Sequence, residues 1–261
     1  MLQRQFNKLA MNKSKYPQIA LIGNGSMGKE ISKIALEREI TISRIFDENN
    51  PLLVSSPNDF DVAIDFSTPN AVVENIKAIC ILQKNIVVGT TGWSNHLPEI
   101  QQLVDKYNIG VVYGSNYSIG MQMYYRIIQQ AARLVNTIPD YDIFMQEIHH
   151  KRKLDSPSGT ALSLGKIVLE EVHRKSIINS ETCHGKIAPE EFHISSLRGG
   201  EVTGTHTVMI DSLADTIEIS HRAKNRSGFA SGALVAADWI WMRQGLYEFT
   251  DQFENIMNSR L

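Results

Sequence analysis

The sequence has few cysteines and no long apolar run, and both absences limit the classes of protein to which it can belong. Its 261 residues include 2 cysteines, Cys80 and Cys183, which form no C-x-x-C pair. This usage fits a reducing compartment without a disulfide framework, so we expect a cytoplasmic protein. Cys183 and His184 could form half of a metal site, but a companion pair is missing and no metal is predicted. No apolar run approaches the length of a membrane span.

An excess of charge of either sign is also missing. The formal net charge is −2 at pH 7, so neither nucleic acid nor a membrane is indicated as a partner. With 43% hydrophobic residues the chain can bury a sizeable core. Met1–Tyr16 alone has one-sided charge: it is basic, has no acidic residue, and lacks the apolar region of a secretory signal. We expect a flexible extension over residues 1–16, with an organellar transit segment as the alternative.

What the chain does contain is a complete dinucleotide-binding pattern near its start. The apolar stretch Gln18–Ile22 predicts a strand, a helical pattern follows the loop, and a second strand over Ile40–Phe46 ends at Asp47, 19 residues after Gly28. The G-x-G-x-x-G loop between strand and helix consists of Gly23, Asn24, Gly25, Ser26, Met27 and Gly28. Its glycines allow a tight turn and a close approach to a pyrophosphate, and Asp47 is expected to accept hydrogen bonds from a ribose hydroxyl.

Strands and helices continue to alternate up to residue 136. We expect strands over 61–65, 85–88 and 109–113, and helices over 69–83, 94–107 and 118–136. This alternation predicts an α/β, Rossmann-type domain with a parallel sheet, which binds ligands beyond the carboxyl ends of its strands. Small and hydroxyl residues recur at those ends, and we therefore expect further cofactor contacts from Gly89, Thr90, Thr91, Gly114, Ser115, Asn116 and Tyr117.

The pattern changes after Pro139. Strands are expected over 142–148, 191–197, 202–210 and 216–221, which predicts an α+β domain with a mixed or antiparallel, largely open sheet. Such a sheet has edges or a face to cover, so oligomer formation is expected. The helix expected over 228–243 and the tail after it could pack back on the first domain. We accordingly predict a dinucleotide-binding domain from 17–120 and 229–261, and a substrate-binding and oligomerisation domain from 121–228.

The segment Glu147–Ala161, with the sequence EIHHKRKLDSPSGTA, concentrates chemistry in one loop. It contains the histidine pair His149 and His150 and the cation Lys153. Ser158 is a good N-cap for a helix whose first residues are Gly159 and Thr160. The positive end of that helix suits a carboxylate or phosphate, which indicates a site for reaction on an anionic small molecule. The other histidines, His184, His193 and His206, are taken as structural or exposed.

Taken together, these residues resemble the 4-hydroxy-tetrahydrodipicolinate reductase (dihydrodipicolinate reductase) family of the lysine and diaminopimelate pathway. The loop is similar to the family's E-x-H-H-x-x-K-x-D-x-P-S-G-T-A motif, and four further segments match: residues 89–92, 116–120, 198–200 and 221–223. The resemblance implies an NAD(P)H-dependent reductase, a dicarboxylate substrate and a homotetramer. It also implies roles for the loop: His149 as proton donor and acceptor, Lys153 as proton donor, and His150 with the Gly159 and Thr160 amides as substrate-binding groups.

The glycine loop departs from the family pattern. It is one residue shorter than the commoner G-x-x-G-x-M-G form and has Ser26 where many members carry Arg; in addition, Tyr117 replaces a frequent Phe. No cation follows Asp47 closely, and a carboxylate there would repel a 2′-phosphate. We therefore expect NADH to be preferred, with NADPH accepted. Two alternatives remain: another NAD-dependent amino-acid or aldehyde dehydrogenase, and a non-catalytic NAD-sensing regulator.

Overall fold

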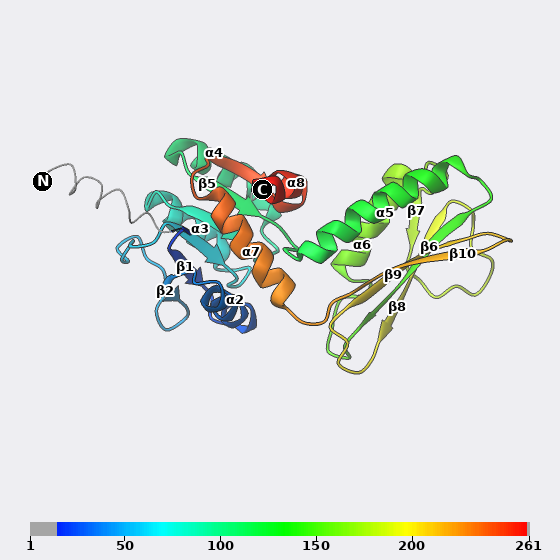
Figure 1. Cartoon of the computed structure of the whole chain (residues 1–261), viewed down its shortest axis with the longest axis horizontal. Coiled ribbons are helices and arrows are strands. Elements are labelled where there is room, and N and C mark those ends of the chain that lie inside the picture. The colour runs from blue at the N-terminus through cyan, green and yellow to red at the C-terminus, as the bar shows by residue number, and fades with distance from the viewer. Residues whose placement is uncertain (1–14, 260–261) are drawn as a thin grey trace, which may run out of the picture. The chain divides into compact units, whose positions relative to one another are not determined.

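The computed structural model describes residues 15–259 and contains two compact units (Figure 1). Unit 1 comprises the residues up to Ser118 and those from Phe229 onward, and unit 2 comprises Ile119–Gly228. Unit 2 is therefore an insertion into unit 1. The flexible extension predicted for residues 1–16 lies, apart from Lys15 and Tyr16, outside the described residues.

Unit 1 is built on a parallel sheet of six strands in the order β11-β5-β4-β3-β1-β2. The strands are β1 (Ile19–Ile22), β2 (Ile42–Phe46), β3 (Val62–Asp65), β4 (Asn85–Val88), β5 (Gly110–Tyr113) and β11 (Gly245–Glu248). After β2 the chain crosses β1 to add β3 on its other side. The carboxyl ends of β1 and β3 thus flank the point where strand order reverses, which is where sheets of this type bind ligands.

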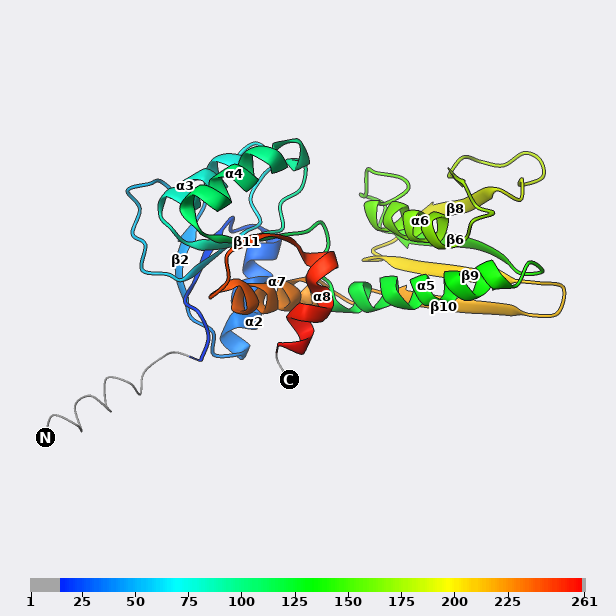
Figure 2. The same ribbon diagram turned by 90° about the horizontal axis from the view of Figure 1, so that it is seen from above.

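Helices cover both faces of this sheet, and Figure 2 shows α3 and α4 on one side with α2, α7 and α8 on the other. The helices are α2 (Ser26–Glu37), α3 (Val72–Ile81), α4 (Leu97–Tyr107), preceded by the 3₁₀ turn η1 (Ser94–His96), α7 (Ser227–Ile240) and α8 (Phe249–Asn258). The strands β1, β3 and β4 are almost wholly buried, as expected of a sheet covered on both faces. The predicted Rossmann-type fold is confirmed.

Unit 2 contains a mixed sheet of five strands in the order β10-β9-β6-β8-β7. The strands are β6 (Asp142–His149), β7 (Ile177–Asn179), β8 (Glu191–Arg198), β9 (Thr205–Asp211) and β10 (Thr216–Arg222). β6, β8 and β7 run parallel, and β9 and β10 run antiparallel to their neighbours. The helices α5 (Ile119–Thr137) and α6 (Gly159–Glu171) pack side by side against it. This agrees with the predicted mixed sheet.

Several element boundaries differ from the predictions. The helix expected from residue 69 begins at Val72, because the Ala71 and Val72 amides first close a turn on the Thr68 carbonyl oxygen. The strand expected from 202 begins at Thr205. The short strands β7 and β11 and the helix α8 were not predicted. β11 reads GLYE and has no clear alternation, and it exists because it pairs with β5, far away in the sequence.

Candidate functional site

The glycine loop lies at the carboxyl end of β1 and requires glycine at two positions. Gly23 has φ of +98°, a conformation that favours glycine, and a Cβ on Gly28 would lie 2.1 Å from the Gly23 carbonyl oxygen. Gly25 is the N-cap of α2 and supplies no side-chain cap to the first-turn amides. Those amides and the helix dipole are the groups that bind phosphate in dinucleotide-binding folds. The loop geometry therefore fits a pyrophosphate.

Three cavities follow the carboxyl edge of the unit 1 sheet and share residues. A cavity of about 510 Å³ contains Gly23, Asn24, Gly25, Lys29 and Asp47 among its lining residues. A second, of about 390 Å³, continues from Gly25 along Ser26 and Met27 to Gly89, Thr90 and Thr91. A third, of about 240 Å³, runs from Thr90 and Thr91 to Gly114 and Ser115. Eleven of the predicted cofactor residues thus line one row of cavities at this edge of the sheet.

The remaining three predicted cofactor residues, Gly28, Asn116 and Tyr117, lie outside these cavities. Gly28 packs against the loop itself. Tyr117 is 1% exposed, and its hydroxyl donates to the carbonyl oxygens of Val88 and Val112. Burial raises the pKa of this phenol well above its usual value. The Tyr117 side chain therefore joins β4 to β5 in the core and is not available to a ligand in this conformation.

Two acidic residues at this edge were not among the predicted site residues, although Asp65 was placed at a strand end by the sequence. The Asp65 carboxylate, at the end of β3, is fully buried and accepts from Ser67, from Asn75 and, at 2.7 Å, from the hydroxyl of Thr90. It holds the β3 and β4 loops together, and its position at the end of an otherwise apolar strand was the available signal. Glu248 lines the third cavity, and burial raises its pKa. Nothing local marked it, because β11 was not predicted.

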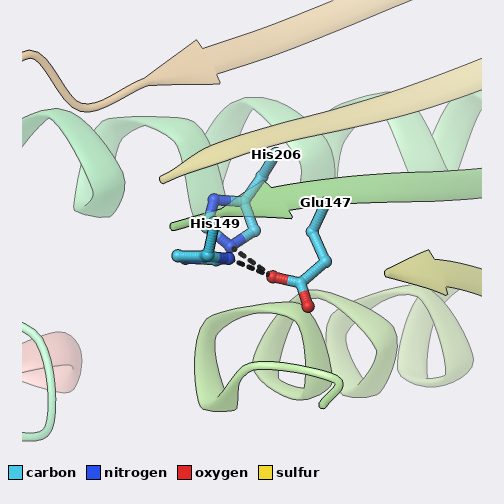
Figure 3. Close-up of side chains that lie close together, drawn as sticks. All are labelled: Glu147, His149 and His206. Carbon is cyan, nitrogen blue, oxygen red and sulfur yellow. Dashed lines mark ion pairs between the residues drawn. The ribbon is translucent and has the colours of Figure 1, made fainter. Parts of the chain in front are cut away.

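A second site lies in unit 2, where β6 ends. Glu147 and His149 are two residues apart on β6 and therefore point to the same face of the sheet, and His206 pairs with Glu147 from β9. His149 Nδ1 lies 2.6 Å from Glu147 Oε2, and His206 Nε2 lies 3.9 Å from the same oxygen (Figure 3). All three residues are buried. His206, taken as structural or exposed from the sequence, thus belongs to this cluster.

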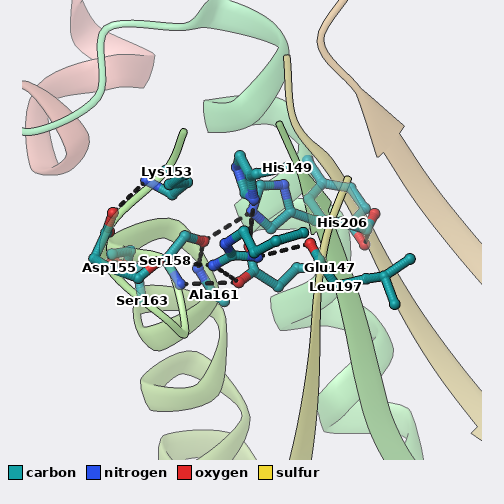
Figure 4. Close-up of polar contacts among 12 residues, drawn as sticks. Glu147, His149, Lys153, Asp155, Ser158, Ala161, Ser163, Leu197 and His206 are labelled. Carbon is teal, nitrogen blue, oxygen red and sulfur yellow. Dashed lines mark hydrogen bonds and ion pairs between the residues drawn. The ribbon is translucent and has the colours of Figure 1, made fainter. Parts of the chain in front are cut away.

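The start of α6 completes the cluster. Ser158 is the N-cap as predicted, and its Oγ accepts from the Ala161 amide at 3.2 Å and lies 3.2 Å from His206 Nε2. The other Glu147 oxygen, Oε1, accepts from the Ser158 amide at 3.1 Å (Figure 4). It also accepts from Arg198 Nη2 at 2.7 Å. Glu147, His149 and His206 are of the types that bind metals and lie within 4.8 Å of one another. The Arg198 guanidinium, 2.7 Å from Glu147 Oε1, would repel a metal ion bound to the same carboxylate. We therefore interpret the cluster as a network of polar contacts rather than a metal site.

Charges in the cluster are set by burial and by its hydrogen bonds. Burial alone would raise the pKa of Glu147, but the hydrogen bonds from His149 and Arg198 outweigh it and hold that pKa well below its usual value. Burial, with the neighbouring His149, lowers the pKa of His206 to about 3. The cluster therefore keeps a carboxylate ionised and His206 neutral around pH 7.

The predicted catalytic and substrate residues of the loop lie close to this cluster in the sequence. His150 begins a turn in which its carbonyl oxygen accepts from the Lys153 amide at 3.1 Å. Lys153 Nζ lies 2.8 Å from Asp155 Oδ1. Hydrogen bonding to Lys153 lowers the pKa of Asp155, and so does a hydrogen bond from the Gly159 amide. Gly159 and Thr160 form the first turn of α6. The Asp155 carboxylate thus contacts both Lys153 and the start of α6.

The neutral state of His206 predicts a pH-dependent stability. In the unfolded chain this histidine takes up a proton near its ordinary pKa of 6.5, whereas in the fold it does so only at about 3. The unfolded state therefore binds more protons between these values, and stability falls as the pH drops below 6.5. We expect wild-type protein to lose roughly 1 kcal/mol more than His206→Gln between about pH 7 and about pH 5.5. Urea unfolding at both pH values tests this, and equal losses in the two proteins would contradict it.

The fold and the row of cavities fit a class of protein: a two-domain, dinucleotide-dependent oxidoreductase, whose second domain here contains the buried cluster of Glu147, His149 and His206. Comparison with known proteins gives the family. Residues 17–117 match the model of the dihydrodipicolinate reductase N-terminus, and residues 120–253 match that of the dihydrodipicolinate reductase C-terminus. The chain belongs to the dihydrodipicolinate reductase family.

Individual relatives agree with this assignment. The 4-hydroxy-tetrahydrodipicolinate reductase of Christiangramia forsetii is 36% identical over 246 residues, which cover 92% of this chain and 99% of the relative. That of Methanococcus aeolicus is 35% identical, over 84% of this chain and 76% of the relative. A solved structure with the same fold is that of a dipicolinate-bound dihydrodipicolinate reductase from Paenisporosarcina sp. TG-14. Its TM-score is 0.69 at 23% identity, and the match covers 90% of this chain and 99% of that chain.

Proposed function

We propose that this protein reduces 4-hydroxy-tetrahydrodipicolinate to tetrahydrodipicolinate with NADH or NADPH, as a cytoplasmic enzyme of lysine and diaminopimelate biosynthesis. The observation that carries the proposal is the loop from Glu147 to Ala161. It places a buried, carboxylate-bound histidine and a lysine beside a helix start that already contacts a carboxylate. Membership of the family supports the choice of substrate. No helix within residues 15–259 is long and apolar enough to cross a membrane.

The 4-hydroxyl group of the substrate leaves as water, together with a proton from the neighbouring carbon, to give a conjugated imine. Reduction of that imine needs a hydride on one carbon and a proton on its neighbour. The nicotinamide cofactor supplies the hydride. The residues proposed to bind the cofactor are those of the glycine loop, Asp47 and the ends of β4 and β5. In unit 2, His149 and Lys153 hold and deliver the proton, since both residue types serve as acids near neutral pH. His150 and the Gly159 and Thr160 amides bind the substrate, and the helix start attracts one of its carboxylates.

Binding of a substrate-like dicarboxylate tests the substrate assignment without turnover. Dipicolinate is the ligand named for the similar solved structure and carries two carboxylates. We expect it to bind to the wild-type protein, and to bind at least about 10-fold more weakly to Lys153→Ala, because a charge-assisted hydrogen bond typically contributes about 1.5–3 kcal/mol. Picolinate, with one carboxylate, is the matched control and should bind weakly to both. Calorimetry that finds no difference between the two ligands would contradict the assignment.

The proposed cofactor preference is supported by the cavity of about 510 Å³. Asp47 lines it, and its Oδ1 accepts from the Asn49 and Asn50 amides at 2.9 and 3.1 Å, which orients the carboxylate. An oriented carboxylate suits the ribose hydroxyls of NADH and repels a 2′-phosphate. Arg44 on β2 pairs with Asp59 in a bidentate salt bridge, whereas Lys29 lines the same cavity as Asp47. We propose that NADH is preferred and that Lys29 allows NADPH to be accepted.

Steady-state kinetics at matched salt test this preference. We expect kcat/KM to be higher with NADH. We also expect Lys29→Ala to lower kcat/KM for NADPH several-fold with little change for NADH, since only the phosphate needs the cation. Lys33→Ala, on the same helix, is the matched control. A higher kcat/KM with NADPH in the wild-type protein would overturn the preference.

The open face of the unit 2 sheet motivates a proposed homotetramer. The buried positions of β6 alternate and face α5 and α6, which leaves Phe144 and Ile148 on the opposite face. Leu197 pairs with Ile148, Met209 pairs with Phe144, and Leu197 is 60% exposed. An apolar patch of this kind on an uncovered sheet face marks an interaction surface.

Light scattering tests the homotetramer. We expect wild-type protein to have four times the mass of one chain, and Leu197→Glu to give smaller particles, because it would place charges in the proposed interface. Leu36→Glu, at an exposed apolar position in unit 1, is the matched control and should not change the mass. Wild-type protein that stays monomeric at working concentration would contradict the proposal.

A further inference from the structure

Glu147 is a fully buried carboxylate whose two oxygens have different partners. Oε2 faces His149 Nδ1 at 2.6 Å, whereas Oε1 accepts from Arg198 and from the backbone amide of Ser158 (Figures 3 and 4). Burying an ion pair contributes little to stability compared with apolar packing of similar volume. Because each oxygen has its own partners, however, the orientation of the carboxylate and of the groups bonded to it is fixed. The oxygen facing His149 has its shortest contact with that imidazole, at 2.6 Å against 3.9 Å to His206 Nε2, and the other oxygen is committed to two donors.

The contact with Glu147 decides where His149 can exchange a proton. A carboxylate is an acceptor only, so Nδ1 must carry a hydrogen in both the neutral and the charged imidazole. Proton gain and loss are then confined to Nε2. Gly204 lies beside that nitrogen, and a Cβ there would be 2.9 Å from Nε2. Glycine at this position keeps space open next to the one nitrogen that Glu147 leaves for chemistry.

We propose that Glu147 is a positioning residue for the reduction: it holds His149 with Nδ1 protonated and Nε2 as the proton-exchanging atom, and through the Ser158 amide it aligns the same site with the start of α6. This inference rests on the proposed function, in which His149 transfers the proton and the first turn of α6 binds the substrate. Glu147 touches neither substrate nor cofactor in this role and acts through His149 and Ser158. One buried carboxylate thereby positions both the proton-transferring histidine and the helix start that binds the substrate.

Glu147→Gln is the sharpest variant, because it keeps the shape and changes one interaction. Arg198 and the Ser158 amide are donors, so the amide oxygen of Gln must face them, and its NH₂ group then faces His149. An NH₂ donor forces Nδ1 to accept and moves the hydrogen of neutral His149 to Nε2. We expect kcat to fall by about 100-fold or more, as for loss of a positioned proton-transfer group. The Kd for NADH should stay within about twofold, and Glu170→Gln, at an exposed position near the end of α6, should behave as wild type.

Two readouts separate positioning from a merely structural role. In a His149→Ala background, Glu147→Gln should cause no further loss of kcat, because the residue acts through an imidazole that is no longer there. ¹⁵N NMR of the imidazole should show the Nδ1–H tautomer of His149 in wild-type protein and the Nε2–H tautomer in Glu147→Gln. Wild-type kcat in Glu147→Gln, losses that multiply in the double variant, or an Nε2–H tautomer in wild-type protein would each overturn the proposal.

The role of Glu147 can still be tested if the Glu147→Gln variant does not fold. The tautomer is read in wild-type protein, and Gly204→Ala tests the same nitrogen from the other side: a Cβ at 2.9 Å should crowd Nε2 and lower kcat at least about 10-fold while NADH binding is kept. Gly204→Ala with wild-type kcat would count against the assignment of Nε2. Failure of the proposed function is distinguishable, because an inactive wild-type protein would overturn the reaction, whereas the wrong tautomer in an active one would overturn only the role of Glu147.

Discussion

Replacing either His149 or Lys153 by alanine should lower kcat by about 10²–10⁴-fold, the usual cost of losing a positioned proton donor. His149 ends β6 and Lys153 lies in the loop between β6 and α6, in a unit separate from the glycine loop. Cofactor binding should therefore persist, with a Kd for NADH within a few-fold of wild type. Stopped-flow turnover and fluorescence titration of NADH measure the two quantities independently.

Lys151→Ala is the matched control for Lys153→Ala. The Lys151 side chain is exposed, and its backbone amide donates to the Gly200 carbonyl oxygen, so this lysine should be replaceable without loss of kcat. If Lys153→Ala and His149→Ala both turned over at wild-type rates, the assignment of the unit 2 site would be wrong. If both lost NADH binding to the same degree as kcat, the loop would belong to the cofactor site instead.

Gly28→Ala should weaken NADH binding by about 10–100-fold, because forcing an extra methyl group into a close contact costs about 1–3 kcal/mol. The added Cβ would lie 2.1 Å from the Gly23 carbonyl oxygen, a backbone atom of the same loop, so the loop that fits the pyrophosphate must shift. Dipicolinate binding in unit 2 should be unchanged. Calorimetric titration of both ligands gives the comparison.

Gly185→Ala controls for the substitution itself, since a Cβ at Gly185 meets no atom within 4 Å. It should bind NADH as the wild-type protein does. NADH binding to Gly28→Ala with wild-type affinity would mean that the glycine loop is not the cofactor site.

The fold was predictable to the extent that it follows local patterns. The strand, glycine loop and helix around Gly23–Gly28 form as expected. The hydroxyl oxygen of Ser158 caps α6, as predicted from the place of this serine just before the helix. In both places the residue type and its neighbours in the sequence suffice to determine the structure. The β11 strand is the opposite case: GLYE becomes a strand only because β5 offers an edge more than a hundred residues earlier in the chain.

The unit 2 site was predictable in its loop but not in its partners. His149 and Lys153 stand in a recognisable motif, whereas His206 and Arg198 reach Glu147 from β9 and β8, and only the register of the sheet shows that they meet. Tyr117 shows the converse limit. It follows the end of β5 among the predicted cofactor residues, yet its hydroxyl bonds back to the β4 and β5 carbonyls inside the core. Whether a side chain at the end of a strand points into the core or toward a ligand depends on tertiary packing, which cannot be deduced from the neighbouring residues in the sequence.

The most direct test of the central claim is turnover of the proposed substrate. Purified protein would be supplied with the product of dihydrodipicolinate synthase and NADH, and the nicotinamide absorbance followed while the product is identified by mass spectrometry. We predict NADH oxidation that depends on the synthase product and yields tetrahydrodipicolinate, and that is lost in Lys153→Ala. NADH binding without turnover would contradict this account and favour a nicotinamide-sensing regulator, and turnover only of an amino acid or aldehyde would favour another dehydrogenase.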